Sequence, residues 1–146
     1  MPHPLDRERF GALLHDTARA WRLRLDQRLK PLGMSQSQWM VLLWLSRGCN
    51  GMSQKALAER LGIEGPAVVG LLDRLARNGW IERRVSAEDR RSKTVHMTPK
   101  AEKTLLQIQT VAAQLRSELL EAISDEKLQH CIEVLEAIGD KADNIK

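Results

Sequence analysis

The sequence predicts a mainly α-helical fold with one small β-ribbon. Three observations predict it: two short helix signals stand in the middle of the chain, two strand-like segments follow them, and long amphipathic stretches occupy both ends. Helix, turn, helix and a charged hairpin, in this order, describe a winged helix-turn-helix module. In such a module the second helix can enter a major groove of DNA while the hairpin reaches an adjacent minor groove.

The boundaries of the central module are marked by capping and helix-ending residues. Ser53 is a good N-cap for the first short helix, which ends at Gly62. The second short helix opens at Gly65-Pro66, where the missing N–H of proline costs nothing, and it stops at Asn78-Gly79. The ribbon consists of residues 80–85 and 93–97, joined by the charged loop 86–92.

Two helices are expected before this module. Apolar residues at a spacing of three to four run from about residue 6 to residue 30, and Pro31 and Gly33 end that stretch. A capping box of Ser35 and Gln38 begins the next helix, which closes at Gly48.

The helices at the two ends of the chain predict a dimer. Thr98 and Ser124 are N-caps for two helices after the ribbon, the first of which continues to about Ile123. Together with the N-terminal helix they carry apolar stripes that one small module cannot bury. We therefore expect a single domain in which residues 1–34 and 99–146 form dimerisation helices that flank a DNA-binding module of residues 35–98. A dimer with two-fold symmetry presents two DNA-binding modules.

The charge is unevenly distributed, although the formal net charge of the 146 residues is only +4. Residues 1–99 hold 17 Lys and Arg against 10 Asp and Glu, whereas residues 100–146 hold 6 against 9. A net positive charge on residues 1–99 suits a protein that binds phosphates with one of its faces. An ordinary solvated surface explains the charge equally well, and only the arginine-rich hairpin favours the first interpretation.

Several functional classes find no support in the sequence. No apolar run approaches the roughly 20 residues of a membrane span, and the N-terminus lacks the layout of a signal peptide, so a cytoplasmic location is expected. The histidines and cysteines have no metal-ligand spacing, and no phosphate-binding or nucleophile motif is present. We therefore expect no enzyme, no metal and no cofactor. Cys49 is expected in a loop, and Cys131 as a buried, unreactive thiol.

Five motifs resemble the MarR family of bacterial transcription regulators. They are Leu57-Ala-Glu-Arg-Leu-Gly-Ile63, Leu72-Asp-Arg-Leu75, Asn78-Gly-Trp-Ile-Glu-Arg-Arg84, Asp89-Arg-Arg91 and Met97-Thr-Pro-Lys-Ala101. The segment from Trp21 to Leu32, followed by Ser35-Gln-x-x-Trp39, is most similar to the SlyA branch. The resemblance implies a homodimeric repressor or activator that binds pseudo-palindromic operators in double-stranded DNA. Many members respond to a small phenolic or aromatic anion, so the resemblance also implies an effector of this kind.

The resemblance assigns the hairpin loop to the minor groove. In the family's Asp-x-Arg pattern the aspartate braces the loop and the arginine enters the groove, which here implies Asp89 and Arg91. Arg90 and Lys93 are neighbours that would contact phosphates or the groove edge. An arginine suits a narrow A·T-rich minor groove because the negative potential is enhanced there. A charged tip that serves only solubility is the alternative.

The base contacts of the second short helix stay open. Its outward face carries Pro66, Val69 and Gly70, and Gly70 stands where many family members have an arginine. Pro66 and Val69 can touch thymine methyl groups. A glycine within a helix costs about 1 kcal/mol relative to alanine, which indicates either a close approach to another group or a chance substitution. Arg74 would serve a phosphate contact or an internal ion pair with Asp73.

Ser53 and Gln54 stand at the start of the first short helix. There they would offer the positive helix N-terminus to a phosphate. Simple capping is the alternative for Ser53, and both roles are compatible.

The resemblance also implies an effector cleft lined by Arg19, Trp21, Ser37 and Trp39. A cation beside an indole is a suitable cradle for an aromatic carboxylate. One polar position of the related cleft is Leu43 here. The alternative places both tryptophans in the core and Arg19 on the surface.

The sequence as a whole predicts a sequence-specific transcriptional regulator. A low-specificity architectural DNA-binding protein and a winged-helix module for protein–protein interaction are the alternatives. The arginine-tipped hairpin argues against the second, whereas Gly70 leaves the first open.

Overall fold

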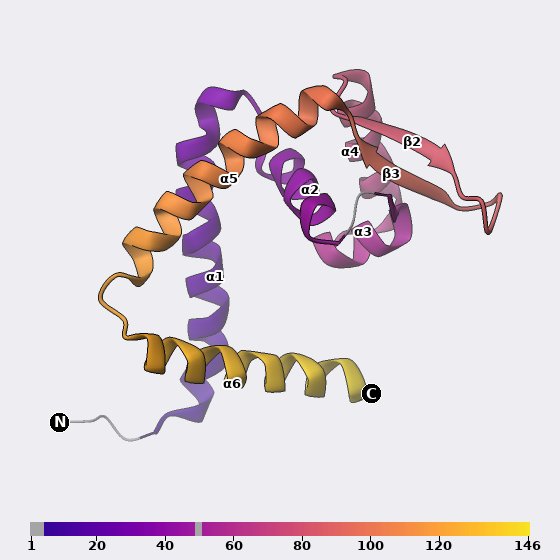
Figure 1. Cartoon of the computed structure of the whole chain (residues 1–146). Helices are drawn as coiled ribbons and strands as arrows, with labels where there is room; N and C mark the ends of the chain where they lie inside the picture. The colour runs from indigo at the N-terminus through magenta and orange to yellow at the C-terminus, as the bar shows by residue number, and fades with distance from the viewer. Residues whose placement is uncertain (1–4, 49–50) are drawn as a thin grey trace. The chain divides into compact units, whose positions relative to one another are not determined.

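A computed structural model of the chain describes residues 5–48 and 51–146. Contacts divide the chain into two compact units, Met1–Ala112 and Ala113–Lys146, and each is described by itself. The protein is mostly helical and contains a small three-stranded antiparallel sheet, as the sequence predicts apart from one added strand (Figure 1). The elements are α1 (Arg7–Leu29), η1 (Lys30–Leu32), α2 (Gln36–Arg47), β1 (Met52–Ser53), α3 (Gln54–Leu61), α4 (Gly65–Arg77), β2 (Ile81–Val85), β3 (Lys93–Met97), α5 (Pro99–Leu120) and α6 (Asp125–Asn144).

Side-chain caps confirm the expected helix starts. The Oγ atom of Ser53 accepts a hydrogen bond from the backbone N–H of Ala56 at 3.1 Å. In α2 the capping box of Ser35 and Gln38 is complete in both directions. Each cap satisfies a backbone donor that a helix N-terminus leaves without a partner. Three further N-caps accept a bond in the same way: Asp6 for α1, Thr98 for α5 and Ser124 for α6.

Two helix ends differ slightly from the expected positions. Helix α1 stops at Leu29, and a 3-10 turn (η1) then carries the chain through Pro31 to Gly33, whose φ of 70° favours glycine. Helix α5 ends at Leu120 and not near Ile123, because a tight turn separates it from the cap of α6. The ends of α3 and α4 lie where the sequence places them.

The sheet contains a short strand that the sequence did not predict. Residues Met52–Ser53 form β1, an edge strand in the order β1-β3-β2, with Met52 opposite Val95. A strand of two residues has no periodicity of its own, and its partner lies far along the chain. Strands β2 and β3 pair along their whole length, which confirms the ribbon. Cys49, which we expected in a loop, lies outside the described residues.

The core of the first unit lies among α2, α3, α4, the sheet, the end of α1 and the first half of α5. Helix α4 turns its apolar positions inward, as its sequence predicts. The indole Nε1 of Trp39 donates to Asp26 Oδ1 at 3.0 Å and so ties α2 to α1. The side chains with no exposed surface are Leu29, Val41, Leu42, Leu45, Leu57, Leu72, Leu75, Val95, Ala101 and Ile108.

The apolar stripes of α1 and α6 remain largely exposed in the single chain, whereas Leu105, Ile108 and Leu115 on the stripe of α5 are buried. On α1, Phe10 and Leu13 expose 44% and 49% of their surface, and α6 has no buried residue along its described length. The expected burial of Cys131 is therefore wrong for the single chain. The prediction placed its thiol on a covered stripe, but nothing in its own unit covers that stripe.

Candidate nucleic-acid interface

Hydrogen bonds within the hairpin loop hold its shape. The carboxylate of Asp89 accepts from the backbone N–H of Arg91 at 2.9 Å and from the hydroxyl of Ser92 at 3.3 Å. The backbone N–H of Ser86 donates to the carbonyl of Ser92 at 2.9 Å and closes the loop. A loop that is already ordered loses less conformational entropy when it binds a partner.

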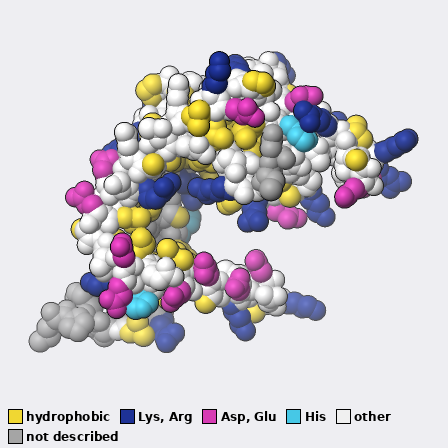
Figure 2. Space-filling model, viewed as in Figure 1, with side chains coloured by type: hydrophobic (Ala, Val, Ile, Leu, Met, Phe, Trp, Pro, Cys, Tyr) yellow, Lys and Arg dark blue, Asp and Glu magenta, His cyan; other side chains and the backbone are white. Residues whose placement is uncertain are grey.

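Cations project from this loop and from the strand that follows it. Arg90, Arg91 and Lys93 are all exposed. Lys and Arg side chains stand out at the tip of the hairpin in the space-filling view (Figure 2). Glu88 and Asp89 share the loop, but the Asp89 carboxylate already accepts two hydrogen bonds within it. The tip therefore presents two guanidinium groups to its surroundings.

Helix α4 combines an apolar inner face with a mixed outer face. Its inner positions, Val68, Leu71, Leu72 and Leu75, are buried. On the outer face, Pro66 and Arg74 are exposed, and Val69 exposes 43% of its surface. The outward placement of these three residues agrees with the sequence analysis.

The ion pair of Asp73 is made with the sheet and not with Arg74. The Oδ1 atom of Asp73 lies 2.6 Å from Arg83 Nη1, so the carboxylate ties α4 to β2. This pair replaces the Arg74–Asp73 pair that the sequence left open. The guanidinium of Arg74 instead lies across Gly70, with Nη1 3.7 Å from the position of an added Cβ. No described neighbour comes close enough to require glycine at position 70.

The start of α3 and the hairpin enclose a common cavity of about 280 Å³. The backbone pairing of Ser53 with Thr94 joins these two elements. Because the Ser53 hydroxyl caps α3 and the Ser92 hydroxyl donates to Asp89, the side chains that remain for a ligand are cationic or amide. The lining residues are Ser53, Gln54, Lys55, Arg91, Ser92 and Lys93.

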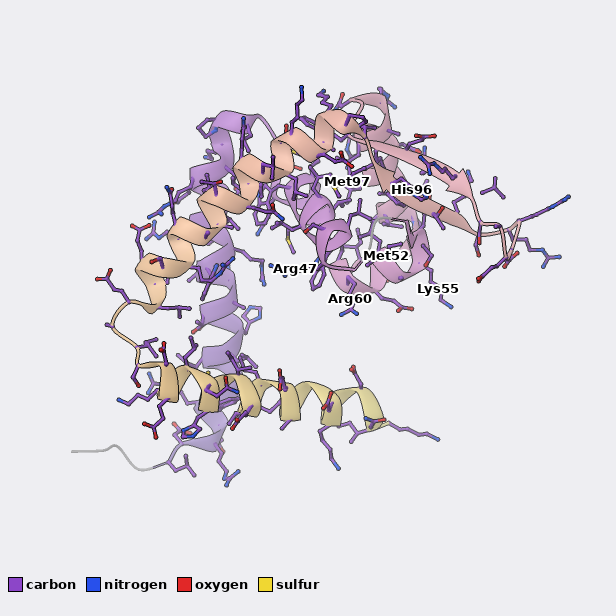
Figure 3. The ribbon with its side chains drawn as sticks, in the orientation of Figure 1. Arg47, Met52, Lys55, Arg60, His96 and Met97 are labelled. Atoms are coloured by element: carbon purple, nitrogen blue, oxygen red, sulfur yellow. The ribbon has the colours of Figure 1, made fainter. Side chains whose placement is uncertain are left out.

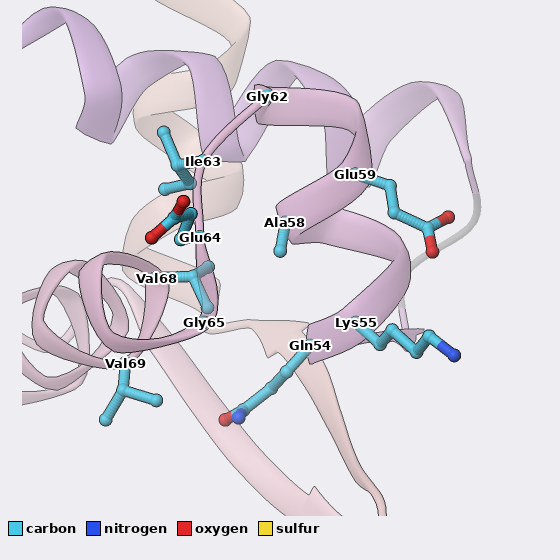
Figure 4. Close-up of a pocket in the computed structure, with 10 residues that line it drawn as sticks. All are labelled: Gln54, Lys55, Ala58, Glu59, Gly62, Ile63, Glu64, Gly65, Val68 and Val69. Atoms are coloured by element: carbon cyan, nitrogen blue, oxygen red, sulfur yellow. The ribbon is translucent and has the colours of Figure 1, made fainter.

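A larger cavity of about 520 Å³ lies between α3 and α4 (Figure 4). Gln54 and Lys55 line it as well as the cavity beside the hairpin. Its wall is otherwise largely apolar and includes Val68 and Val69. The first turn of α3, the outer face of α4 and the hairpin therefore border one continuous surface.

A third cavity, of about 230 Å³, lies between α1 and α2 and contains two of the four residues expected in the effector cleft. Trp21 and Trp39 line it, as expected, although Trp39 is only 2% exposed and forms part of the core. Arg19 and Ser37 are exposed residues outside its lining. The cations that do line it are Arg22 and Arg47.

Sequence reasoning missed the residue that joins this cavity to α3. The ring of Trp44 lies under two guanidinium groups, 5.4 Å from that of Arg47 and 5.5 Å from that of Arg60. Figure 3 shows Arg47 and Arg60 at the facing ends of α2 and α3. The three-residue spacing of Trp44 and Arg47 on a helix was a usable signal for half of this cluster.

Within residues 5–48 and 51–146, no three His, Cys, Asp or Glu side chains gather as they would around a metal ion. None of the helices in these ranges joins the length and the apolarity that crossing a bilayer requires.

Comparison with known proteins identifies the family. The MarR family model matches residues 32–92. The crystal structure of transcriptional regulator PA3341 is 42% identical over 93% of this chain and 99% of its own, with a TM-score of 0.87. A MarR transcriptional regulator from Methanosarcina mazei Go1 shares 22% identity over 96% of this chain and all of its own, with a TM-score of 0.84.

A complex with DNA is among the similar structures. The S. aureus MepR–DNA complex shares 22% identity over 91% of this chain and 97% of its own, with a TM-score of 0.76. At this identity the likeness concerns the fold. With the family model and the 42% identical regulator, it agrees with the winged module described above. The chain belongs to the MarR family of transcriptional regulators.

Proposed function

We propose that this chain regulates transcription by binding pseudo-palindromic operators in double-stranded DNA as a homodimer. The observation that carries the proposal is the braced hairpin: Asp89 holds the backbone of Arg91, so an ordered loop presents two arginines. The similarity to MepR, which was crystallised with DNA, supports the same interpretation.

Each element of the proposed interface has a separate task. Arg91 enters the minor groove, where a narrow A·T-rich segment concentrates negative potential. Arg90 and Lys93 contact phosphates beside it, and Ser53 offers the first turn of α3 to a third phosphate. Arg74, whose neighbour Asp73 is occupied by Arg83, remains available for the phosphate role. Pro66 and Val69 place apolar surface in the major groove, and Gly70, which Arg74 lies across, adds no side chain of its own.

The homodimer is proposed from the apolar stripes that the single chain leaves exposed. Residues 1–34 and 99–146 would form the dimerisation helices, and residues 35–98 the DNA-binding module. Exposed stripes on α1 and α6 are long enough to need a partner in water. A second copy of the chain supplies the same stripes, as a two-fold interface requires.

Selection of bound fragments from random DNA tests this proposal against its two rivals. A sequence-specific dimer selects a two-fold symmetric motif whose half-sites lie about one helical turn apart. An architectural protein selects composition or flexibility without a symmetric motif. A protein–protein module selects nothing above background, and that result would exclude DNA binding.

We also propose that a small aromatic carboxylate lowers DNA affinity from the cavity between α1 and α2. The specific observation is that Arg22, Arg47 and the indoles of Trp21, Trp39 and Trp44 border this space of about 230 Å³. Because α2 packs on α3, an anion there would act next to the winged module. The assignment to the SlyA branch stays a prediction that rests on residues 21–39.

A further inference from the structure

The first two turns of α4 carry no side chain that can hydrogen-bond to a base. The outward or flanking positions are Gly65, Pro66, Ala67, Val69 and Gly70. Helix-turn-helix proteins read base edges mainly with the N-terminal residues of this second helix. If the protein selects a sequence through the major groove, another element of the same surface has to supply the polar contact.

Gln54 lies where such a contact is needed. Its side chain lines both the cavity between α3 and α4 and the cavity beside the hairpin. Figure 4 shows Gln54 and Val69 pointing toward the same side, whereas Lys55 points away from Val69. The amide therefore borders the outer face of α4, although it belongs to α3.

The amide oxygen of Gln54 lacks a partner. Oε1 is buried, and it accepts no hydrogen bond from any described residue. A buried acceptor without a partner is unfavourable, and native proteins retain few of them without a reason. The amide would gain a hydrogen bond by turning toward a donor outside the chain. A carboxamide offers one donor side and one acceptor side, which matches the N7 and N6 edge of adenine.

We propose that Gln54 is the residue that reads adenine in the major groove, with Val69 packing on a neighbouring thymine methyl group. This inference rests on the proposed DNA-binding function and assigns base selection to α3 instead of α4. Each half-site then has an A·T pair that faces Gln54. The cavity between α3 and α4 lies directly behind the amide, so the side chain has space to turn.

Three variants of the full chain test the proposal by selection from random DNA and by measured affinities at fixed salt. Gln54→Met keeps the length of the side chain without its polar atoms. Gln54→Glu keeps an acceptor and removes the amide donor. Lys55→Met is the matched control, because it removes the charged ammonium group of a neighbouring side chain in the same turn of α3.

The parent protein should prefer A·T over G·C at one position of each half-site by about 5- to 150-fold, the range of one bidentate contact. Gln54→Met should reduce this preference to less than about twofold at that position and leave the other positions unchanged. Gln54→Glu should move the preference to cytosine, whose N4 amino group donates to a carboxylate. Lys55→Met should weaken all sequences alike and keep the preference.

Thermal unfolding distinguishes base reading from a merely structural role. Gln54→Met removes an unpartnered acceptor, so its unfolding temperature should equal or exceed that of the parent. An unchanged base preference in Gln54→Met, within a retained two-fold motif, would overturn the assignment of Gln54 alone. A parent protein that selects no symmetric motif would overturn the proposed function and this inference with it.

Discussion

The ion pair between Asp73 and Arg83 ties α4 to β2, and its removal should be measurable in two ways. The two charged atoms lie 2.6 Å apart, and the side chains are 46% and 24% exposed. Exposed pairs contribute about 0.2–1 kcal/mol, and this pair belongs at the upper end because the guanidinium is mostly covered. We therefore expect Asp73→Ala to lower the free energy of unfolding by about 1 kcal/mol, or the unfolding temperature by about 2–4 °C.

A double-mutant cycle isolates this contribution. The free energies of unfolding of the parent, Asp73→Ala, Arg83→Ala and the double variant should give a coupling energy of about 0.5–1 kcal/mol, falling in high salt. The same variants should bind DNA more weakly, because α4 and the hairpin are no longer held in one orientation. A coupling energy near zero, together with unchanged DNA affinity, would refute the reasoning that this pair positions α4.

Three other perturbations test the proposed interface, the dimer and the effector cavity. Arg91→Ala should weaken specific DNA binding by about 1–3 kcal/mol in an affinity assay at moderate salt, and by more than Arg90→Ala does. Equal affinity of Arg91→Ala and parent would remove the hairpin loop from the interface. Deletion of residues 124–146 should shift the chain from dimer toward monomer in sedimentation, and a monomeric full-length chain at micromolar concentration would contradict the dimer. Salicylate should quench tryptophan fluorescence with an upper micromolar to millimolar dissociation constant, which corresponds to roughly 4–6 kcal/mol. Arg47→Ala should weaken this binding while Arg19→Ala leaves it unchanged, and the reverse order would place the anion elsewhere.

Local signals were enough to predict where most of the helices begin. Ser35, Ser53, Thr98 and Ser124 cap helices by bonds to residues three positions away, so the sequence contains both partners. The ribbon was equally predictable, because its two strands are adjacent in the sequence and each has its own alternation of residue types. The edge strand β1 was not visible, because its two residues become a strand only through pairing with β3.

Long-range contacts explain what the sequence could not supply about the candidate site. Asp73 has an arginine beside it in sequence, yet it pairs with Arg83 on the strand that packs against α4. The cations of the α1–α2 cavity could not be assigned because their orientation depends on how the two helices pack. The sequence placed Gln54 at the start of α3, but its unpartnered oxygen became evident only in three dimensions.

One measurement tests most directly whether this chain binds DNA as a dimer with two DNA-binding modules. Its affinity is compared, at one salt concentration, for the selected two-fold operator and for the same fragment with one half-site scrambled. The proposed homodimer should lose at least about a hundredfold in affinity, because each mismatched base pair costs roughly 1–3 kcal/mol and a scrambled half-site holds several. Equal affinity for the two fragments would contradict two-fold recognition and leave only non-specific binding to phosphates.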